Sequence, residues 1–193
     1  MKSIRRYLFN PFLHPLKNIL ICLFVLFISS ETNEETLTWD AANKLTWADF
    51  KAKPDYDSDA VALTASGITF GYGVKTSGKR IVEFSSTVET HFYPNKSWYK
   101  KEESNVHILR HEQLHFDITE LYSRKLRQQI TKLQVNQNIK KQLNQLHEDI
   151  NVELSATQAK YDQETQHSID AVKQRAWSNF IEKELKLLDA FKS

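Results

Sequence analysis

The C-terminal half of this chain contains no residue type that readily breaks a helix. No glycine or proline occurs after Pro94, and these two residues most often mark the ends of helices and strands. Apolar residues recur at helical spacing within this half, for example over residues 139–150. We therefore predict that it is almost entirely helical, with one helix over residues 108–126 and a final helix from about Tyr161.

The stretch before it, residues 60–92, has the character of a β-hairpin. Residues 68–74 alternate and are rich in β-forming side chains, residues 77–79 provide a turn, and residues 81–92 alternate again. Strands followed by a run of helices predict an α+β fold. In the second arm of the hairpin, one face carries Phe84, Val88 and Phe92.

A His-Glu-x-x-His motif lies at His111, Glu112 and His115, inside the first predicted helix. A helix advances about 100° per residue, so these histidines share a face about 6 Å apart along the axis and can bind one Zn²⁺. The glutamate between them then lies beside the metal, where it can accept a proton from an activated water. This division of roles is the signature of metallopeptidases.

Helical projection places both histidines inside an apolar stripe that faces the core. An unsatisfied buried polar group costs about 1–3 kcal/mol, and one shared metal ion would satisfy both rings. The alternative is two core histidines that are hydrogen-bonded to backbone or hydroxyl groups. His107 lies about 12 Å from His115 by the same geometry, too far to share its ion. The stripe consists of Ile108, Leu114, Ile118, Tyr122 and Leu126.

A catalytic zinc site needs a third protein ligand. The metzincin pattern would require Gly and His at positions held by Ile118 and Leu121, so that class is excluded. The segment Tyr161–His167 is rich in oxygen and imidazole donors and is the best source of the missing ligand. The candidates, in order of preference, are His167, Glu164, Asp162 and Asp117.

The N-terminus has the layout of a secretory signal peptide over residues 1–30. Basic residues precede the apolar run Ile19–Ile28, and Ser29 and Ser30 follow it. The run is shorter than the roughly 20 residues of a spanning helix; an uncleaved N-terminal anchor is the alternative, and would be the one means of membrane association. We expect a secreted, periplasmic or cell-envelope protein, with a polar linker over residues 31–36 and a single domain over residues 37–193.

Composition excludes several other classes of protein. The only cysteine, Cys22, lies in the predicted leader, so the exported part has no disulfide, no thiol nucleophile and no cysteine-rich zinc site. The formal net charge of +2 includes the basic residues of the leader, and no basic patch is interleaved with aromatic residues. Nucleic-acid binding is therefore not expected, and any metal must be held by histidine and carboxylate side chains.

Three segments carry a resemblance to a known bacterial family across roughly residues 37–188. They are Leu45–Phe50, Arg110–Ile118 and Tyr161–His167, the last followed by Gln174 and Trp177. These segments are similar to the domain of unknown function 922 family, whose members are described as candidate secreted zinc-dependent proteases. Leu114 and Ser168 depart from the small glycine residues expected of the family.

The resemblance implies zinc ligation by the two histidines of the motif, with Glu112 as the base, and a functional role for the Tyr161–His167 segment. We therefore expect a zincin-like α+β domain, in which a hairpin or small sheet precedes the metal-binding helix. Tyr161 or Tyr122 would donate a hydrogen bond to the oxyanion, and an exposed edge of the hairpin would pair with a peptide or protein substrate. The expected Zn²⁺ ligands are His111, His115 and His167.

Two other functions stay open at this point. The chain could be a non-catalytic envelope interaction module, with a structural or vestigial metal site and a partner bound to its Gln- and Lys-rich helices. It could also hydrolyse a different amide, such as a cell-wall cross-link. Neither the cleavage preference nor the oligomeric state follows from these patterns.

Overall fold

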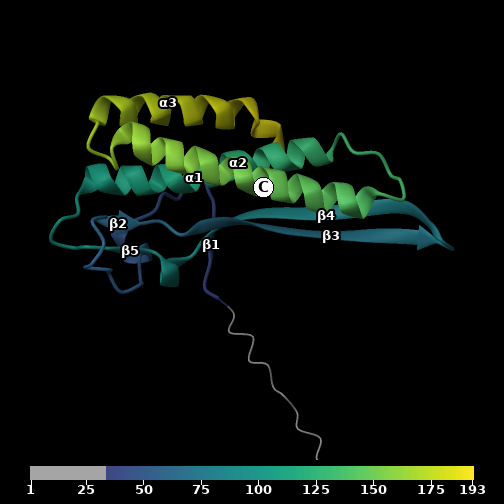
Figure 1. The fold of residues 1–193 in the computed structure, drawn as a ribbon, viewed down its shortest axis with the longest axis horizontal. Coiled ribbons are helices and arrows are strands. Elements are labelled where there is room, and N and C mark those ends of the chain that lie inside the picture. Colours follow the sequence, from purple (N-terminus) through teal and green to yellow (C-terminus); the bar gives the residue numbers. More distant parts are fainter. Residues whose placement is uncertain (1–33) are drawn as a thin grey trace, which may run out of the picture. The chain divides into compact units, whose positions relative to one another are not determined.

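The computed structural model describes residues 34–193, which lie within one folded unit. The predicted signal peptide and the first part of the predicted linker lie outside the described residues. The part that is described has an α+β fold, in which small N-terminal sheets are followed by three helices (Figure 1). None of these helices is both long enough and apolar enough to cross a membrane.

A long hairpin forms the main sheet, as the alternation of residues 68–92 predicts. β3 (Ser66–Ser77) pairs antiparallel with β4 (Arg80–Phe92), and β1 (Leu37–Thr38) pairs with the other edge of β4, giving the order β1-β4-β3. Gly78 adopts a φ of +60° in the turn, a conformation that glycine accepts without strain. β3 therefore has no strand partner on its outer edge among residues 34–193.

A second, two-stranded sheet pairs β2 (Ala62–Leu63) with β5 (Trp98–Tyr99). Two short 3-10 helices, Trp47–Asp49 and Pro94–Lys96, lie in the connections before and after the main hairpin. Aromatic rings pack around this region; Trp47, for example, stacks on Tyr99 with ring centroids 4.5 Å apart. Trp47 is therefore part of the packing of this region.

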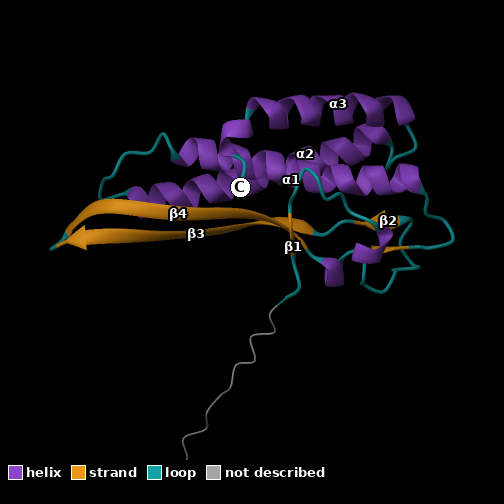
Figure 2. Ribbon diagram, turned by 180° about the vertical axis from the view of Figure 1, so that it is seen from behind, coloured by secondary structure: helices purple, strands orange, loops and turns teal. Residues whose placement is uncertain are grey.

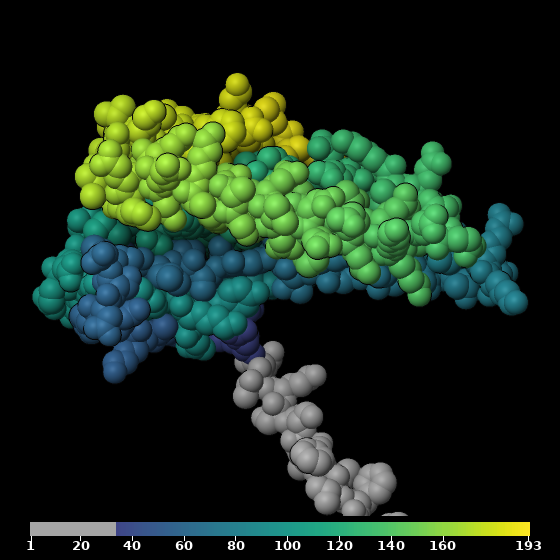
Figure 3. All heavy atoms as spheres, in the orientation of Figure 1, coloured from purple at the N-terminus to yellow at the C-terminus, as the bar shows by residue number. Residues whose placement is uncertain are grey.

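Three long helices lie on one side of the hairpin, where two of them pack on it and the third packs on those two (Figure 2). They are α1 (Val106–Ile130), α2 (Ile139–Thr165) and α3 (Ala171–Leu187), and a short 3-10 helix, Asp189–Phe191, follows them. α1 contacts both β3 and β4 as well as the other two helices. In the space-filling view, α2 runs between α3 and the hairpin, whose turn projects beyond the helices (Figure 3).

α1 begins where its sequence provides a cap and ends 24 residues later at Ile130. The side chain of Asn105 accepts hydrogen bonds from the backbone N–H groups of His107 and Ile108, which would otherwise lack partners. The apolar stripe predicted for this helix lies mainly in the core, where Ile118 and Leu126 are fully buried. The helix expected over residues 108–126 is therefore confirmed and is longer than predicted.

The prediction of a final helix from about Tyr161 is wrong. Tyr161 lies near the end of α2, and α3 begins only at Ala171. Between the two helices Gln166, His167 and Ser168 adopt φ values of 50°, 52° and 77°, which cannot continue a right-handed helix. The side chain of Asp170 then caps α3 by accepting from two backbone N–H groups. His167 consequently lies in a turn and not on a helix face.

A buried charge network fastens the C-terminal end of α1 to its surroundings. Glu120 is fully buried, and its two carboxylate oxygens accept hydrogen bonds from Arg124, Arg127 and Thr90. The arginines continue outward to backbone carbonyl groups of Leu185 in α3 and of Val88 in β4. This network joins the sheet, α1 and the end of α3.

We predict that Glu120→Ala destabilises the protein by about 3–5 kcal/mol, because it leaves buried arginine charges without their counterion. Denaturant unfolding followed by circular dichroism measures this change. Glu182→Ala, at an exposed position of α3, is the matched control and should change stability by no more than about 0.5 kcal/mol. Equal stability of the two variants would contradict the role of the network.

Candidate metal centre

Three side chains from two helices meet at one point in the structure. His111 and His115 lie one turn apart on α1, and Asp162 approaches them from the last turn of α2. Asp162 Oδ1 lies 3.1 Å from His111 Nε2 and 2.9 Å from His115 Nε2, and the two Nε2 atoms are 3.2 Å apart. The three atoms therefore form a nearly equilateral triangle.

The size of this triangle fits a tetrahedral metal site. With ligand bonds of 2.0–2.1 Å, neighbouring ligand atoms around zinc are about 3.3 Å apart. An ion at that bond length could therefore contact all three atoms at once. Imidazole nitrogen and carboxylate oxygen are also ligand types that zinc prefers. The geometry and the chemistry of the donor set thus both fit a divalent cation.

Hydrogen bonding alone accounts for the triangle less well. The other ring nitrogen, Nδ1, of His111 lies 2.9 Å from Gln174 Oε1, and that of His115 is hydrogen-bonded to Gln158 Oε1. If each Nδ1 carries a proton and donates it to a glutamine, a second proton on Nε2 makes that ring cationic. Both rings would have to be cationic to donate their Nε2–H groups to Asp162. Two imidazolium rings would then face each other across 3.2 Å with one carboxylate between them, whereas a metal ion needs no such protons.

The pKa values of the cluster follow from burial and mutual contact. Burial raises the pKa of Asp162, but hydrogen bonds from His111 and His115 more than offset it and hold that pKa well below its usual range. Burial lowers the pKa of His115, yet the hydrogen bond to Asp162 and the charge of Glu112 reverse the shift, so that the pKa lies above 6.5. Asp162 is therefore ionised at neutral pH and can serve as an anionic ligand.

Glu112 contributes a buried carboxylate with spare hydrogen-bonding capacity. Its residue is only 4% exposed, and Oε2 has no hydrogen-bond partner among residues 34–193. The hydroxyl of Thr64, next to β2, donates to the backbone carbonyl of Glu112 and holds this turn of α1 against the small sheet. A buried carboxylate oxygen without a partner is rare in folded proteins and calls for a functional explanation.

Tyr161 forms the wall behind the two histidines. The residue is fully buried, and its ring stacks on His111 with centroids 4.5 Å apart and planes inclined at 23°. Its hydroxyl lies 3.0 Å from Gln174 Oε1 and 3.3 Å from the carbonyl oxygen of His111. Burial, followed by the charge of Glu112, raises the pKa of this phenol. These contacts support a positioning role, and a role as oxyanion donor stays a prediction.

The other predicted ligands lie at different distances from the triangle. His167 is exposed, with 79% of its side chain accessible, and its Nδ1 lies 4.0 Å from Asp162 Oδ1, on the margin of the cluster. Glu164 accepts from the indole N–H of Trp177 and thus links α2 to α3. Asp117 accepts from the indole of Trp39. The structure therefore brings Asp162, the third-ranked candidate, to the histidines, while ligation by His167 stays a prediction.

Sequence reasoning missed the glutamines that contact the histidines. Gln158 lies four residues before Asp162, so both side chains project from one face of α2, and this spacing is the signal that could have identified it. The sequence indicates Gln174 only as a residue that follows the third family segment. His107 is not part of the triangle, as its predicted distance from His115 requires, and its Nε2 lies 2.6 Å from the carbonyl oxygen of Ser168.

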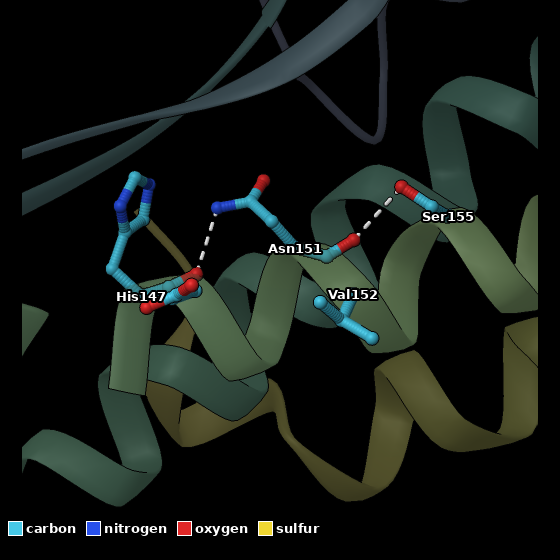
Figure 4. A pocket seen from close by; sticks show the side chains of 5 residues that line it. His147, Asn151, Val152 and Ser155 are labelled. Atoms are coloured by element: carbon cyan, nitrogen blue, oxygen red, sulfur yellow. Dashed lines mark hydrogen bonds between the residues drawn. The ribbon is translucent and has the colours of Figure 1, made fainter. Parts of the chain in front are cut away.

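A shallow surface hollow of about 560 Å³ lies elsewhere, along α2. It is lined by His147, Glu148, Asn151, Val152 and Ser155. Two of its polar side chains are used within the helix, since Asn151 donates to the carbonyl of His147 and Ser155 to that of Asn151 (Figure 4). None of the three residues of the candidate metal cluster lines it.

The fold and the cluster define an α+β protein with a candidate His-His-Asp metal site between its first two long helices. The model of a family described as bacterial protein of unknown function, domain of unknown function 922, matches residues 43–168. The chain belongs to this family, as the resemblance of its three segments predicts. Comparison with curated proteins and with solved structures finds no match. The family description assigns no activity.

We predict that Asp162→Ala lowers zinc affinity by more than about 100-fold, beyond the 10- to 100-fold typical of residues that only contact a ligand. His167→Ala is the matched comparison from the same end of α2 and should cost much less. Zinc uptake measured by elemental analysis after dialysis, and affinity measured by chelator competition, report both variants. Greater zinc loss in His167→Ala than in Asp162→Ala would reverse the assignment of the third ligand.

We also predict that zinc affinity falls as the pH is lowered from 8 to 5.5. The ion and protons compete for the same Nε2 atoms, and the raised pKa of His115 starts this competition above pH 6.5. Asp162 stays ionised over this range because its pKa is lowered. Each displaced proton contributes a loss of about tenfold per pH unit. Chelator competition at several pH values measures this slope, and a pH-independent affinity would contradict ligation by histidine.

Proposed function

We propose that this protein is a zincin-like, zinc-dependent hydrolase of peptide bonds. The observation that carries the proposal is the triangle formed by His111, His115 and Asp162, with the buried, partly unpartnered carboxylate of Glu112 on the same helix as the two histidines. Three protein ligands with one open position are typical of catalytic zinc, whereas structural zinc sites are closed by four. A free carboxylate next to that open position is the further element that hydrolysis requires.

The metal would supply one part of the chemistry and the chain the rest. A zinc ion held by the triangle would acidify a water at its open position and polarise the substrate carbonyl. Glu112 would take a proton from the attacking water and pass it to the leaving amine as the C–N bond breaks. Its position between the two histidines on one helix keeps the carboxylate beside the ligands throughout. Tyr161 would hold the ring of His111 in place.

Two histidines and one carboxylate also suit Fe²⁺ in oxygenases, so the choice of metal needs its own support. Glu112 provides that support, because a buried base beside the ligands serves hydrolysis of a peptide bond. His167, at the exposed margin of the cluster, would add a further ligand or contact the substrate. Metal analysis of protein purified without added metal distinguishes zinc from iron.

The substrate in this proposal is an extended peptide or an unfolded segment of a protein. The outer edge of β3 has no strand partner among the described residues, and such an edge can pair with an extended chain. The start of β3 lies close to the metal helix, since the hydroxyl of Ser66 is 2.7 Å from that of Thr119 on α1. With a cleavable leader, the enzyme would act outside the cytoplasm, in the envelope or the medium.

A second candidate function is a non-catalytic interaction module. The outer side of α3 and the turn before it expose large apolar residues that have no cover in the described unit, among them Ile169, Val172 and Phe180. Such residues, where they gather, can mark a protein interface. In that case the metal site would be structural, and its glutamate would be dispensable.

We predict that Glu112→Gln lowers peptidase activity by about 10²–10⁴-fold, the usual contribution of a general base, while zinc content is unchanged. The assay follows the release of peptides from an unfolded protein substrate, with elemental analysis of the same samples. Glu153→Gln, at an exposed site on α2, is the matched control and should retain activity. Undiminished hydrolysis by Glu112→Gln would refute this mechanism, and no hydrolysis by the wild type under any condition would favour the interaction module.

A further inference from the structure

We infer that Gln158 and Gln174 are positioning residues of the metal centre, each of which selects the ligand atom of one histidine. This inference rests on the proposed metal site but not on any catalytic activity. Gln158 comes from α2 and Gln174 from α3, and each side-chain carbonyl faces the Nδ1 of a different ring. The centre would therefore be assembled from all three helices, although its ligands come from only two.

The orientation of Gln158 is defined by its own contacts. Its Nε2 lies 2.9 Å from the backbone carbonyl oxygen of His115 and 3.3 Å from the hydroxyl of Thr119. The carbonyl is an obligate acceptor and must receive an N–H, so the amide nitrogen faces α1 and Oε1 is left for the ring of His115. This glutamine thus clamps both the backbone and the ring of one ligand.

Gln174 reaches His111 from the other side of the cluster. The residue is 5% exposed, and its Oε1 contacts both the hydroxyl of Tyr161 and the Nδ1 of His111, while its Nε2 has no hydrogen-bond partner among residues 34–193. Trp177 holds α3 close enough to α2 for Gln174 to reach His111, because its indole N–H donates to Glu164 on α2. The packing of α3 on α2 therefore affects the metal site, because it sets the position of Gln174, which contacts the ligand His111.

The chemical effect of each contact is to fix which nitrogen carries the proton. A neutral imidazole has one N–H and one lone pair. When Nδ1–H donates to a glutamine carbonyl, the lone pair must lie on Nε2, which is the atom that each ring directs at the triangle. Hydrogen bonds of this kind orient ligand rings and are worth about 10- to 100-fold in metal affinity.

The use of neutral amides in place of carboxylates sets the charge of the centre. A divalent ion is already balanced by the two carboxylates of Asp162 and Glu112 when both histidines are neutral. A carboxylate at either glutamine position would make the centre anionic and increase the electron donation of the ring, since an anionic acceptor raises ligand basicity. The amides therefore orient the rings while preserving the Lewis acidity of the ion.

The test compares zinc affinity and imidazole N–H signals in the zinc-loaded full chain. We expect Gln158→Leu to weaken zinc binding by about 10- to 100-fold and to remove the low-field proton NMR signal of the His115 Nδ1–H, while that of His111 remains. Gln174→Leu should have the reciprocal effect. Gln145→Leu, at an exposed position of α2, is the matched control and should leave both signals and the affinity unchanged.

Gln158→Glu and Gln174→Glu provide the second measurement, which does not depend on tolerance of an apolar side chain. They should retain the N–H signals, shift them further to low field and bind zinc more tightly than the wild type. Unchanged signals and affinity in both leucine variants, or glutamate variants that bind zinc as weakly as the leucine variants, would overturn the inference. A wild type that takes up no zinc would overturn the metal site itself, whereas one that binds zinc without cleaving peptides would refute only the hydrolase.

Discussion

The arrangement of the helices depends on the polar side chains that α1 buries. This helix lies between the sheet and the other two helices, and a charged group buried there without a partner costs several kcal/mol. Toward its N-terminal end it buries His111 and Glu112, and toward its C-terminal end Glu120 and Arg124. Partners for His111, Glu120 and Arg124 come from the sheet, α2 and α3. Because they come from every neighbouring element, the neighbours are restricted to one position relative to α1.

The helices and strands in which apolar residues recur at one regular spacing could be predicted from the sequence. Alternation over β3 and β4 identified the hairpin and the face of Val88, because side chains of a strand point alternately to opposite faces. The stripe at Ile118 and Leu126 identified α1 and the inward direction of its histidines, since one helix face must be apolar to be buried. These predictions needed only local geometry. The motif at His111 and His115 belongs to the same category, because both residues lie on one helix.

Contacts between separate helices could not be predicted in this way. The left-handed turn at Gln166–Ser168 uses no glycine, so the periodicity of α2 gave no sign that it ended before His167. Because this turn was not predicted, helical projection placed His167 on a helix face. His167 was therefore preferred to Asp162 as the third metal ligand. The partner of each histidine depends on how α2 and α3 are rotated about their axes, and helix rotation is decided by packing, such as the contact of Trp177 with Glu164.

The two buried polar groups on α1, around Glu120 and around Glu112, differ in how completely their side chains are paired. This difference indicates that the first serves stability and the second serves the chemistry of the site. The group around Glu120 is closed, because both carboxylate oxygens are paired with Arg124, Arg127 or Thr90. The group around Glu112 is open, with an unpaired oxygen among the described residues and an Asp162 side chain that is 30% accessible. An ion that binds only the folded arrangement would add its binding energy to the stability of the helix packing. α3 would share in this coupling although it lies beyond residue 168, where the family match ends.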